Sequence, residues 1–129
     1  MGVQIHAEAL GTQDGAVNLI DDGPSNQARI GGLESNASAC EVRQVSLETA
    51  VKQAGGLIDL LKLDCEGAEW KILKASGGWQ SVRNVRLEYH LFGGESAEDA
   101  ARELSRLGFR ILRIQRYHDA GGVIWAARA

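Results

Sequence analysis

The chain has 129 residues, a length that suits one domain or part of one. Its hydrophobic content of 44% and charged content of 24% are those of a globular protein with a core. The formal net charge of −3 supplies no basic field for phosphate backbones, which argues against nucleic acid as a partner. No apolar run approaches the ~18 residues of a membrane span, and the first residues lack a secretion signal. We therefore expect a cytoplasmic protein that binds neither nucleic acid nor membrane.

The two cysteines, Cys40 and Cys65, stand outside any metal-ligand spacing. We expect both to be reduced, in agreement with a cytoplasmic compartment. Cys65 lies among carboxylates, which should raise the pKa of its thiol and discourage thiolate chemistry.

The first part of the chain predicts strands joined by turns. Residues 3–10 alternate apolar and polar side chains, which is typical of a strand. Asp14-Gly15 is a strong hairpin signal, so residues 16–20 should form the partner strand. Residues 21–39 are rich in Gly, Ser and Asn, and predict a loop with room for one edge strand.

The centre of the chain predicts a helix and then a strand. A short strand over 42–45 leads to Ser46, a good N-cap for a helix that Gly55-Gly56 ends. The apolar run that follows, Leu57 to Leu63, is bounded by glycines. We interpret it as a strand buried on both faces, as in a parallel sheet.

Three carboxylates follow this strand, those of Asp64, Glu66 and Glu69, and Gly67 permits a tight turn between them. A helical pattern then runs over residues 68–75. Open α/β sheets place their ligands at the carboxyl ends of the strands, so this acidic turn is the candidate site.

The last third of the chain predicts a strand, a helix and a hairpin. The strand covers 82–91, with Val85, Leu87 and Tyr89 facing one way. Ser96 and Asp99 form a capping-box pattern before a helix that Gly108 ends. Two further strands should close the domain as an antiparallel pair, over 109–117 and 123–128.

This order predicts an α/β fold with parallel core strands and a C-terminal antiparallel hairpin. Right-handed crossovers should bring the strand ends at Asp64 and His90 side by side. Asp64, Glu66, Glu88 and His90 could then converge on one hydroxyl group, and a carboxylate or an imidazole can accept its proton.

Each of these residues also has a structural interpretation. Asp64 could cap the following helix, and Glu69 could serve the helix dipole. His90 could be a structural histidine with satisfied hydrogen bonds. A divalent metal held by Asp64, Glu66 and Glu88 is a further alternative on ligand type.

The run LLKLDCEGAEWKIL, residues 60–73, resembles the Lys-Ile-Asp-Val-Glu-Gly-x-Glu signature of the FkbM-type methyltransferases. Leu87-Glu88-Tyr89-His90 is similar to the strand that follows in that family, and Glu8-Ala9-Leu10-Gly11 fits its layout. The resemblance implies a partial Rossmann-like methyltransferase sheet that uses S-adenosylmethionine. It implies O-methylation of a small-molecule hydroxyl acceptor, a sugar or natural product. The implied site residues are Asp64, Glu66, Glu88 and His90 for catalysis, and Asp64, Ala9 and Leu10 for the cofactor.

The chain departs from the family pattern at its start, where no Asp-x-Gly-x-x-x-Gly or Gly-x-Gly stands. Residues 1–129 are therefore interpreted as a single, truncated methyltransferase-type domain that corresponds to the C-terminal half. The alternative is a non-catalytic remnant that acts as a binding or oligomerisation module. A missing neighbour would leave an apolar sheet edge unpaired, and we expect that edge to invite a homo-oligomer.

Overall fold

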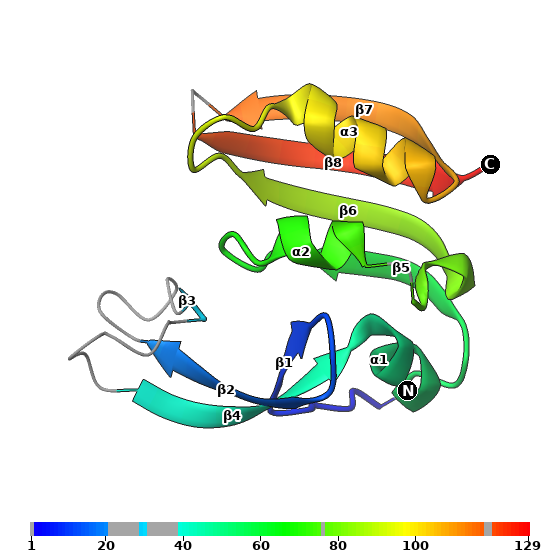
Figure 1. Ribbon diagram of the computed structural model, residues 1–129. Coiled ribbons are helices and arrows are strands. Elements are labelled where there is room, and N and C mark those ends of the chain that lie inside the picture. Colours follow the sequence, from blue (N-terminus) through cyan, green and yellow to red (C-terminus); the bar gives the residue numbers. More distant parts are fainter. Residues whose placement is uncertain (1, 21–28, 31–38, 76, 118–119) are drawn as a thin grey trace.

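The computed structural model describes residues 2–20, 29–30, 39–75, 77–117 and 120–129. The described residues form two four-stranded sheets, with strand orders β1-β4-β2-β3 and β5-β6-β8-β7 (Figure 1). The strands are β1 Glu8–Gly11, β2 Gly15–Ile20, β3 Arg29–Ile30, β4 Ala39–Ser46, β5 Ile58–Leu63, β6 Val82–His90, β7 Phe109–Tyr117 and β8 Gly121–Arg128. The helices are α1 Leu47–Gln53, α2 Glu69–Lys74 and α3 Ala97–Arg106, with a 3-10 turn over Trp79–Ser81.

The second sheet has the predicted layout. Strand β5 pairs in parallel with β6, in a register that sets Leu61 opposite Val85 and Leu63 opposite Leu87. Strand β8 then pairs antiparallel with β6, and β7 closes the sheet against β8. The predicted parallel pair and the antiparallel hairpin beyond it are confirmed, and the fold is mixed α/β.

The core lies between this sheet and its helices. Val85, Leu87 and Tyr89 on β6 are all buried on the face that the sequence predicted. Helices α2 and α3 cover that face (Figure 1), and α3 contributes buried Ala100 and Leu104. None of the described helices is long and apolar enough to cross a membrane.

Both predicted helix caps are present. The Ser46 hydroxyl accepts the Thr49 N–H at 3.2 Å at the start of α1. At the start of α3, the Ser96 hydroxyl accepts the Asp99 N–H at 3.2 Å, and the Asp99 carboxylate accepts the Ser96 N–H at 2.9 Å. Hydrogen bonds from Ser96 are also the main reason that the pKa of Asp99 is lowered. The capping box therefore fixes where α3 begins.

The predicted hairpin between the first two strands is wrong. Strand β4 lies between β1 and β2, parallel to the first and antiparallel to the second, so β1 and β2 do not pair. The turn that contains Asp14 is stabilised by the start of α1. The Asp14 carboxylate accepts hydrogen bonds from the Ser46 N–H and the Thr49 hydroxyl, each at 2.9 Å. The first strand is also shorter than predicted, since residues 2–7 have no strand structure and Val3 and Ile5 are exposed.

Strand β5 is less buried than predicted. Only Leu63 is fully buried, while Leu60 is 62% exposed. The reason is that β5 stands at the edge of its sheet, and no strand among the described residues pairs with its other side (Figure 1). A parallel strand is buried on both faces only when it has neighbours and covering layers on both sides.

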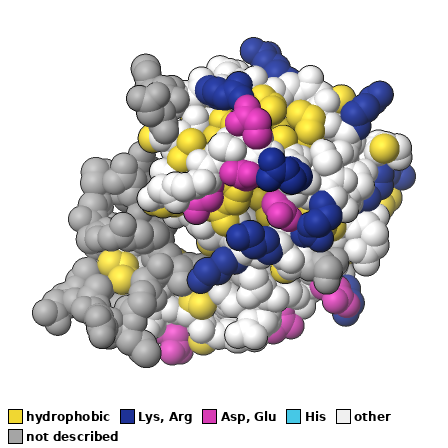
Figure 2. Space-filling model, turned by 45° about the horizontal axis from the view of Figure 1, so that its top comes forward, with side chains coloured by type: hydrophobic (Ala, Val, Ile, Leu, Met, Phe, Trp, Pro, Cys, Tyr) yellow, Lys and Arg dark blue, Asp and Glu magenta, His cyan; other side chains and the backbone are white. Residues whose placement is uncertain are grey.

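The surface seen in Figure 2 carries acidic and basic side chains interspersed with apolar ones. This mixture agrees with a chain whose formal net charge is only −3.

Replacing Leu60 by lysine should weaken self-association of the chain. The edge of β5 that no described strand pairs with lies beside an exposed apolar side chain, and a charge there opposes pairing with another strand. We expect the apparent mass from light scattering to rise with concentration in the unchanged chain and less steeply in Leu60→Lys. Melting temperatures should agree closely, because Leu60 is exposed.

The matched control is Leu112→Lys, an exposed leucine on β7 at the opposite edge of the sheet. It should leave association unchanged, because Arg110, Arg113 and Arg116 already place positive charge along β7 and oppose pairing at that edge. A monomer at all concentrations, or an equal effect from both variants, would contradict the assignment of association to β5.

Candidate functional site

The acidic turn after β5 has an unusual backbone. Glu66 has a φ of 47° and Gly67 a φ of 105°, both in the left-handed region, before α2 begins at Glu69. The φ of Gly67 would strain any other residue, and a Cβ atom there would also lie 2.6 Å from the exposed Phe92 ring. A non-glycine residue such as Glu66 adopts this conformation seldom, and here it reverses the chain sharply beside the end of β6.

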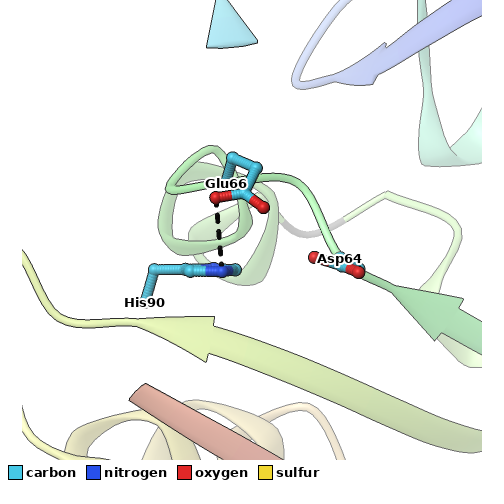
Figure 3. Close-up of side chains that lie close together, drawn as sticks. All are labelled: Asp64, Glu66 and His90. Carbon is cyan, nitrogen blue, oxygen red and sulfur yellow. Dashed lines mark ion pairs between the residues drawn. The ribbon is translucent and has the colours of Figure 1, made fainter. Parts of the chain in front are cut away.

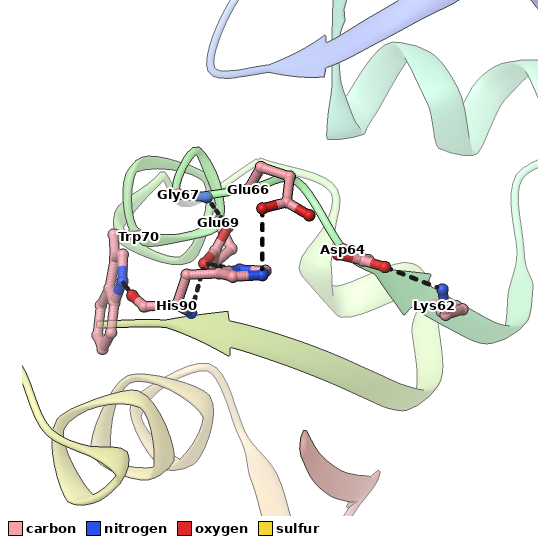
Figure 4. A network of polar contacts seen from close by, with 7 residues as sticks. All are labelled: Lys62, Asp64, Glu66, Gly67, Glu69, Trp70 and His90. Carbon is pink, nitrogen blue, oxygen red and sulfur yellow. Dashed lines mark hydrogen bonds and ion pairs between the residues drawn. The ribbon is translucent and has the colours of Figure 1, made fainter. Parts of the chain in front are cut away.

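The Glu69 carboxylate is the centre of the site (Figure 4), and its side chain is 0% exposed. One oxygen, Oε2, accepts the Gly67 N–H at 2.7 Å. The other, Oε1, accepts the His90 backbone N–H at 2.8 Å and lies 2.9 Å from Nδ1 of the same residue. Because both oxygens already accept backbone N–H groups, we assign the ring nitrogen as a donor.

His90 is therefore fixed on several sides. Its carbonyl oxygen accepts the Trp70 indole N–H at 2.8 Å, and its ring stacks on Phe92 at a centroid distance of 6.4 Å. With Nδ1 bound to Glu69, the free nitrogen Nε2 points to Glu66 and lies 3.5 Å from Oε2 of that carboxylate (Figure 3). The ring thus presents its other nitrogen to the partly exposed carboxylates of Glu66 and Asp64. The solvent-accessible edge formed by these three side chains is called the opening of the site below.

Asp64, Glu66 and His90 each bring one oxygen or nitrogen atom to a group whose members all lie within 4.8 Å of one another. This confirms that the ends of β5 and β6 lie side by side. The Asp64 carboxylate is exposed and pairs with the Lys62 ammonium group at 3.2 Å. Glu88 is not part of this group, although it lies two residues before His90 on β6.

The structural alternatives for the turn can now be judged. Asp64 does not cap α2, because the N-cap position is Ala68 and no side chain makes a cap hydrogen bond there. Glu69 begins α2 as the sequence suggested, but its hydrogen bonds go to Gly67 and His90. A role in the helix dipole alone does not account for a buried carboxylate with these partners.

Sequence reasoning missed this role of Glu69. One signal was available, because Glu69 stands three and four residues before Ile72 and Leu73, which the helical pattern places in the core. A carboxylate on that side of a helix must find hydrogen-bond donors inside the protein.

A cavity of about 390 Å³ lies between the acidic turn and the first sheet. Glu66, Gly67 and Cys65 line one side of it, and residues of the first sheet and its turn line the other. The members from the first sheet and its turn are Gly11, Thr12, Gln13, Val17 and Gln44. Its volume is in the range of small-molecule pockets.

The residues predicted to contact the cofactor come from both sheets. Ala9 and Leu10 belong to β1 in the first sheet, while Asp64 follows β5 in the second. Leu10 lines a different cavity of about 330 Å³, together with His6 and Glu8, and Asp64 is not among its lining residues.

The Cys65 thiol has the raised pKa that the sequence predicted. Burial is the main cause and the Glu69 charge the second, and together they raise the pKa to about 11. Both cysteines are free thiols in the structure.

Residues 3–111 match the family described as the methyltransferase FkbM domain. No curated protein and no solved structure matches the chain.

Cys65 should react far more slowly with iodoacetamide than Cys40. Only the thiolate attacks, and raising a thiol pKa from 9.0 to about 11 lowers the thiolate fraction at neutral pH by about 100-fold. Mass spectrometry over a time course at pH 8 should find one fast alkylation, which Cys40→Ser removes. Two alkylations at similar rates in the folded chain would contradict the burial of Cys65.

Proposed function

Since the chain belongs to the FkbM methyltransferase family, we propose that it serves S-adenosylmethionine-dependent methylation of a hydroxyl group on a small molecule. A sugar or another natural product is the acceptor class that we propose. The observation that carries this proposal is the orientation of His90. Its Nδ1 is bound by buried Glu69, and its Nε2 faces the opening beside Glu66.

Methyl transfer to a hydroxyl needs a base for the hydroxyl proton. S-adenosylmethionine supplies, when bound, an electrophilic methyl group on a positively charged sulfur. As the acceptor oxygen bonds to the methyl carbon, the carbon–sulfur bond breaks, its electron pair stays on sulfur, and the oxygen loses its proton. A positioned imidazole or carboxylate can take that proton.

His90 is the side chain best arranged to be this base. A base oriented by a third group through its other nitrogen is the arrangement used to activate hydroxyl groups in many enzymes. Once protonated at Nε2, the ring would stand between the Glu66 and Glu69 carboxylates, whose oxygens lie 3.5 Å and 2.9 Å from its two nitrogens.

The carboxylates at the opening are proposed to hold the acceptor. Asp64 and Glu66 can each accept a hydrogen bond from a hydroxyl group, which suits an acceptor with several hydroxyls. Glu88 remains a predicted catalytic residue. It lies two residues before His90 on β6, outside the group formed by Asp64, Glu66 and His90. Positioning of the acceptor oxygen in this way can supply much of the rate acceleration.

The cavity beside the turn fits the reacting end of the cofactor only in part. Glu66 offers a carboxylate for the positive sulfur, and Val17 and Ile72 offer apolar surface. A cofactor that also contacted Asp64, Ala9 and Leu10 would have to bridge the two sheets. We therefore propose that the chain alone binds S-adenosylmethionine weakly, and that a strand seated on the open edge of β5 completes the site.

The second candidate is a non-catalytic binding or oligomerisation module. The observation in its favour is the open edge of β5, which exposes 62% of Leu60 and 47% of Leu57. A sheet edge of this kind pairs readily with a strand of another chain. We propose that a second copy of the chain occupies it when no other strand does.

Methyl transfer can be measured with isotopically labelled S-adenosylmethionine and a panel of hydroxylated acceptors. Millimolar cofactor offsets the weak binding that we expect. Asp64→Asn and His90→Gln should each lower the rate, His90→Gln by about 10²–10⁴-fold, the range of general acid–base catalysis, and Asp64→Asn by less, because Asp64 is proposed to hold the acceptor. The melting temperature of Asp64→Asn should stay close to that of the unchanged chain, because Asp64 is exposed and caps no helix.

Glu95→Gln is the matched control, because Glu95 is an exposed carboxylate on the loop after β6. It should keep the full rate. Unchanged turnover in both Asp64→Asn and His90→Gln would rule out the proposed roles. Absence of transfer to every acceptor, together with concentration-dependent dimerisation, would favour the non-catalytic module.

A further inference from the structure

Three potential metal ligands converge at the opening of the site from different parts of the chain. Asp64 follows β5, Glu66 occupies the left-handed turn, and His90 ends β6, yet their ligand atoms all lie within 4.8 Å of one another. Carboxylate oxygens and imidazole nitrogen are common ligands of divalent metals. Two of the three residues are half-buried, and the opening is accessible from solvent.

The contact between the buried Glu69 carboxylate and Nδ1 of His90 is a separate observation that points to a ligand. Glu69 binds Nδ1 at 2.9 Å and is itself fully buried and tied to the Gly67 backbone. Metal-binding histidines almost always donate their second ring N–H to a carboxylate or carbonyl group, which fixes the ring and makes the ligating nitrogen more basic. Glu69 lies outside the trio and provides this support.

Nε2 of His90 lies 3.5 Å from Oε2 of Glu66, and an Asp64 carboxylate oxygen completes the group within 4.8 Å. Three ligand atoms this close, from three parts of the chain, can bind a single ion held between them. We propose that Asp64, Glu66 and His90 bind a divalent transition-metal ion.

The ligand set indicates which ions should bind. One imidazole nitrogen and two carboxylates suit Mn²⁺, Co²⁺ or Zn²⁺, whereas Mg²⁺ and Ca²⁺ prefer oxygen ligands alone. Three protein ligands also leave coordination positions for water or for oxygens of an acceptor. Ion binding and the proposed proton transfer use the same atom, Nε2 of His90, so a bound ion would take the place of the transferred proton there. The inference goes beyond the proposed function, because ion binding can be measured without methyl transfer.

Lys62 offers a variant that should strengthen metal binding instead of weakening it. Its ammonium group lies 3.2 Å from Oδ2 of Asp64 and is the cation that neutralises this carboxylate in the structure. A bound metal ion would have to displace it. Removing the Lys62 charge should therefore strengthen metal binding, while removing a ligand should weaken it.

In the experiment, the chain is titrated with Mn²⁺. Binding is measured by calorimetry and by paramagnetic broadening of the NMR signals of the His90 ring protons. Broadening should be saturable, and Mg²⁺ should compete poorly. Glu66→Gln and His90→Gln should each weaken binding at least tenfold, and Glu69→Gln about tenfold, as for other carboxylates that support a metal-binding histidine. Lys62→Met should tighten binding several-fold, and Glu95→Gln should leave it unchanged.

Several results would overturn the proposal. Equal losses in Glu66→Gln and Glu95→Gln would mean that Mn²⁺ only collects around surface acids. Binding that survives His90→Gln would remove His90 from the ligand set. If His90→Gln does not fold, Lys62→Met still decides, because it keeps all three ligands and weaker or equal binding contradicts the site. Loss of methyl transfer with ion binding intact would count against the proposed function alone.

Discussion

The buried carboxylate of Glu69 is the interaction on which the site depends. Its two oxygens bind the turn at Gly67, the end of β6 at the His90 amide, and the His90 ring. A charge without water must be paired, and leaving it unpaired costs several kcal/mol. The turn, the strand end and the ring therefore cannot move independently, and Nε2 of His90 faces the opening as a consequence.

The fold supplies the framework for this interaction. Parallel pairing sets β5 and β6 in register, so their carboxyl ends stop at the same edge, and α2 returns over the sheet with Glu69 in its first turn. The buried face of β6 and the capped helix α3 hold that edge in place. Within the described part of the chain β5 has no second neighbour, so the site lies beside an open sheet edge and a cavity that reaches the first sheet.

The sequence was sufficient where local pattern decides the structure. Alternating apolar residues predicted the buried face of β6, and the Ser96 and Asp99 pair predicted the start of α3. It failed where distant residues decide, because the partners of Asp14 lie 32 and 35 positions away and no hairpin rule includes them. The exposure of Leu60 could not be predicted either, since an apolar run does not reveal how many neighbours a strand has.

At the site, too, some features could be predicted from the sequence and others could not. Asp64, Glu66 and His90 were predicted because strand order brings the ends of parallel strands together. The role of Glu69 depends on which way its side chain turns, and the first turn of a helix accepts carboxylates for several reasons. Its place among core residues of α2 was a weak signal, which gained meaning only when His90 was found beside it.

The central claim is that Glu69 fixes the His90 tautomer. Nitrogen-15 NMR of the imidazole ring in its neutral form tests this directly. We expect the proton on Nδ1 in the unchanged chain, and a mixture of tautomers in Glu69→Gln. A proton on Nε2 in the unchanged chain, or an identical spectrum in the variant, would contradict the account.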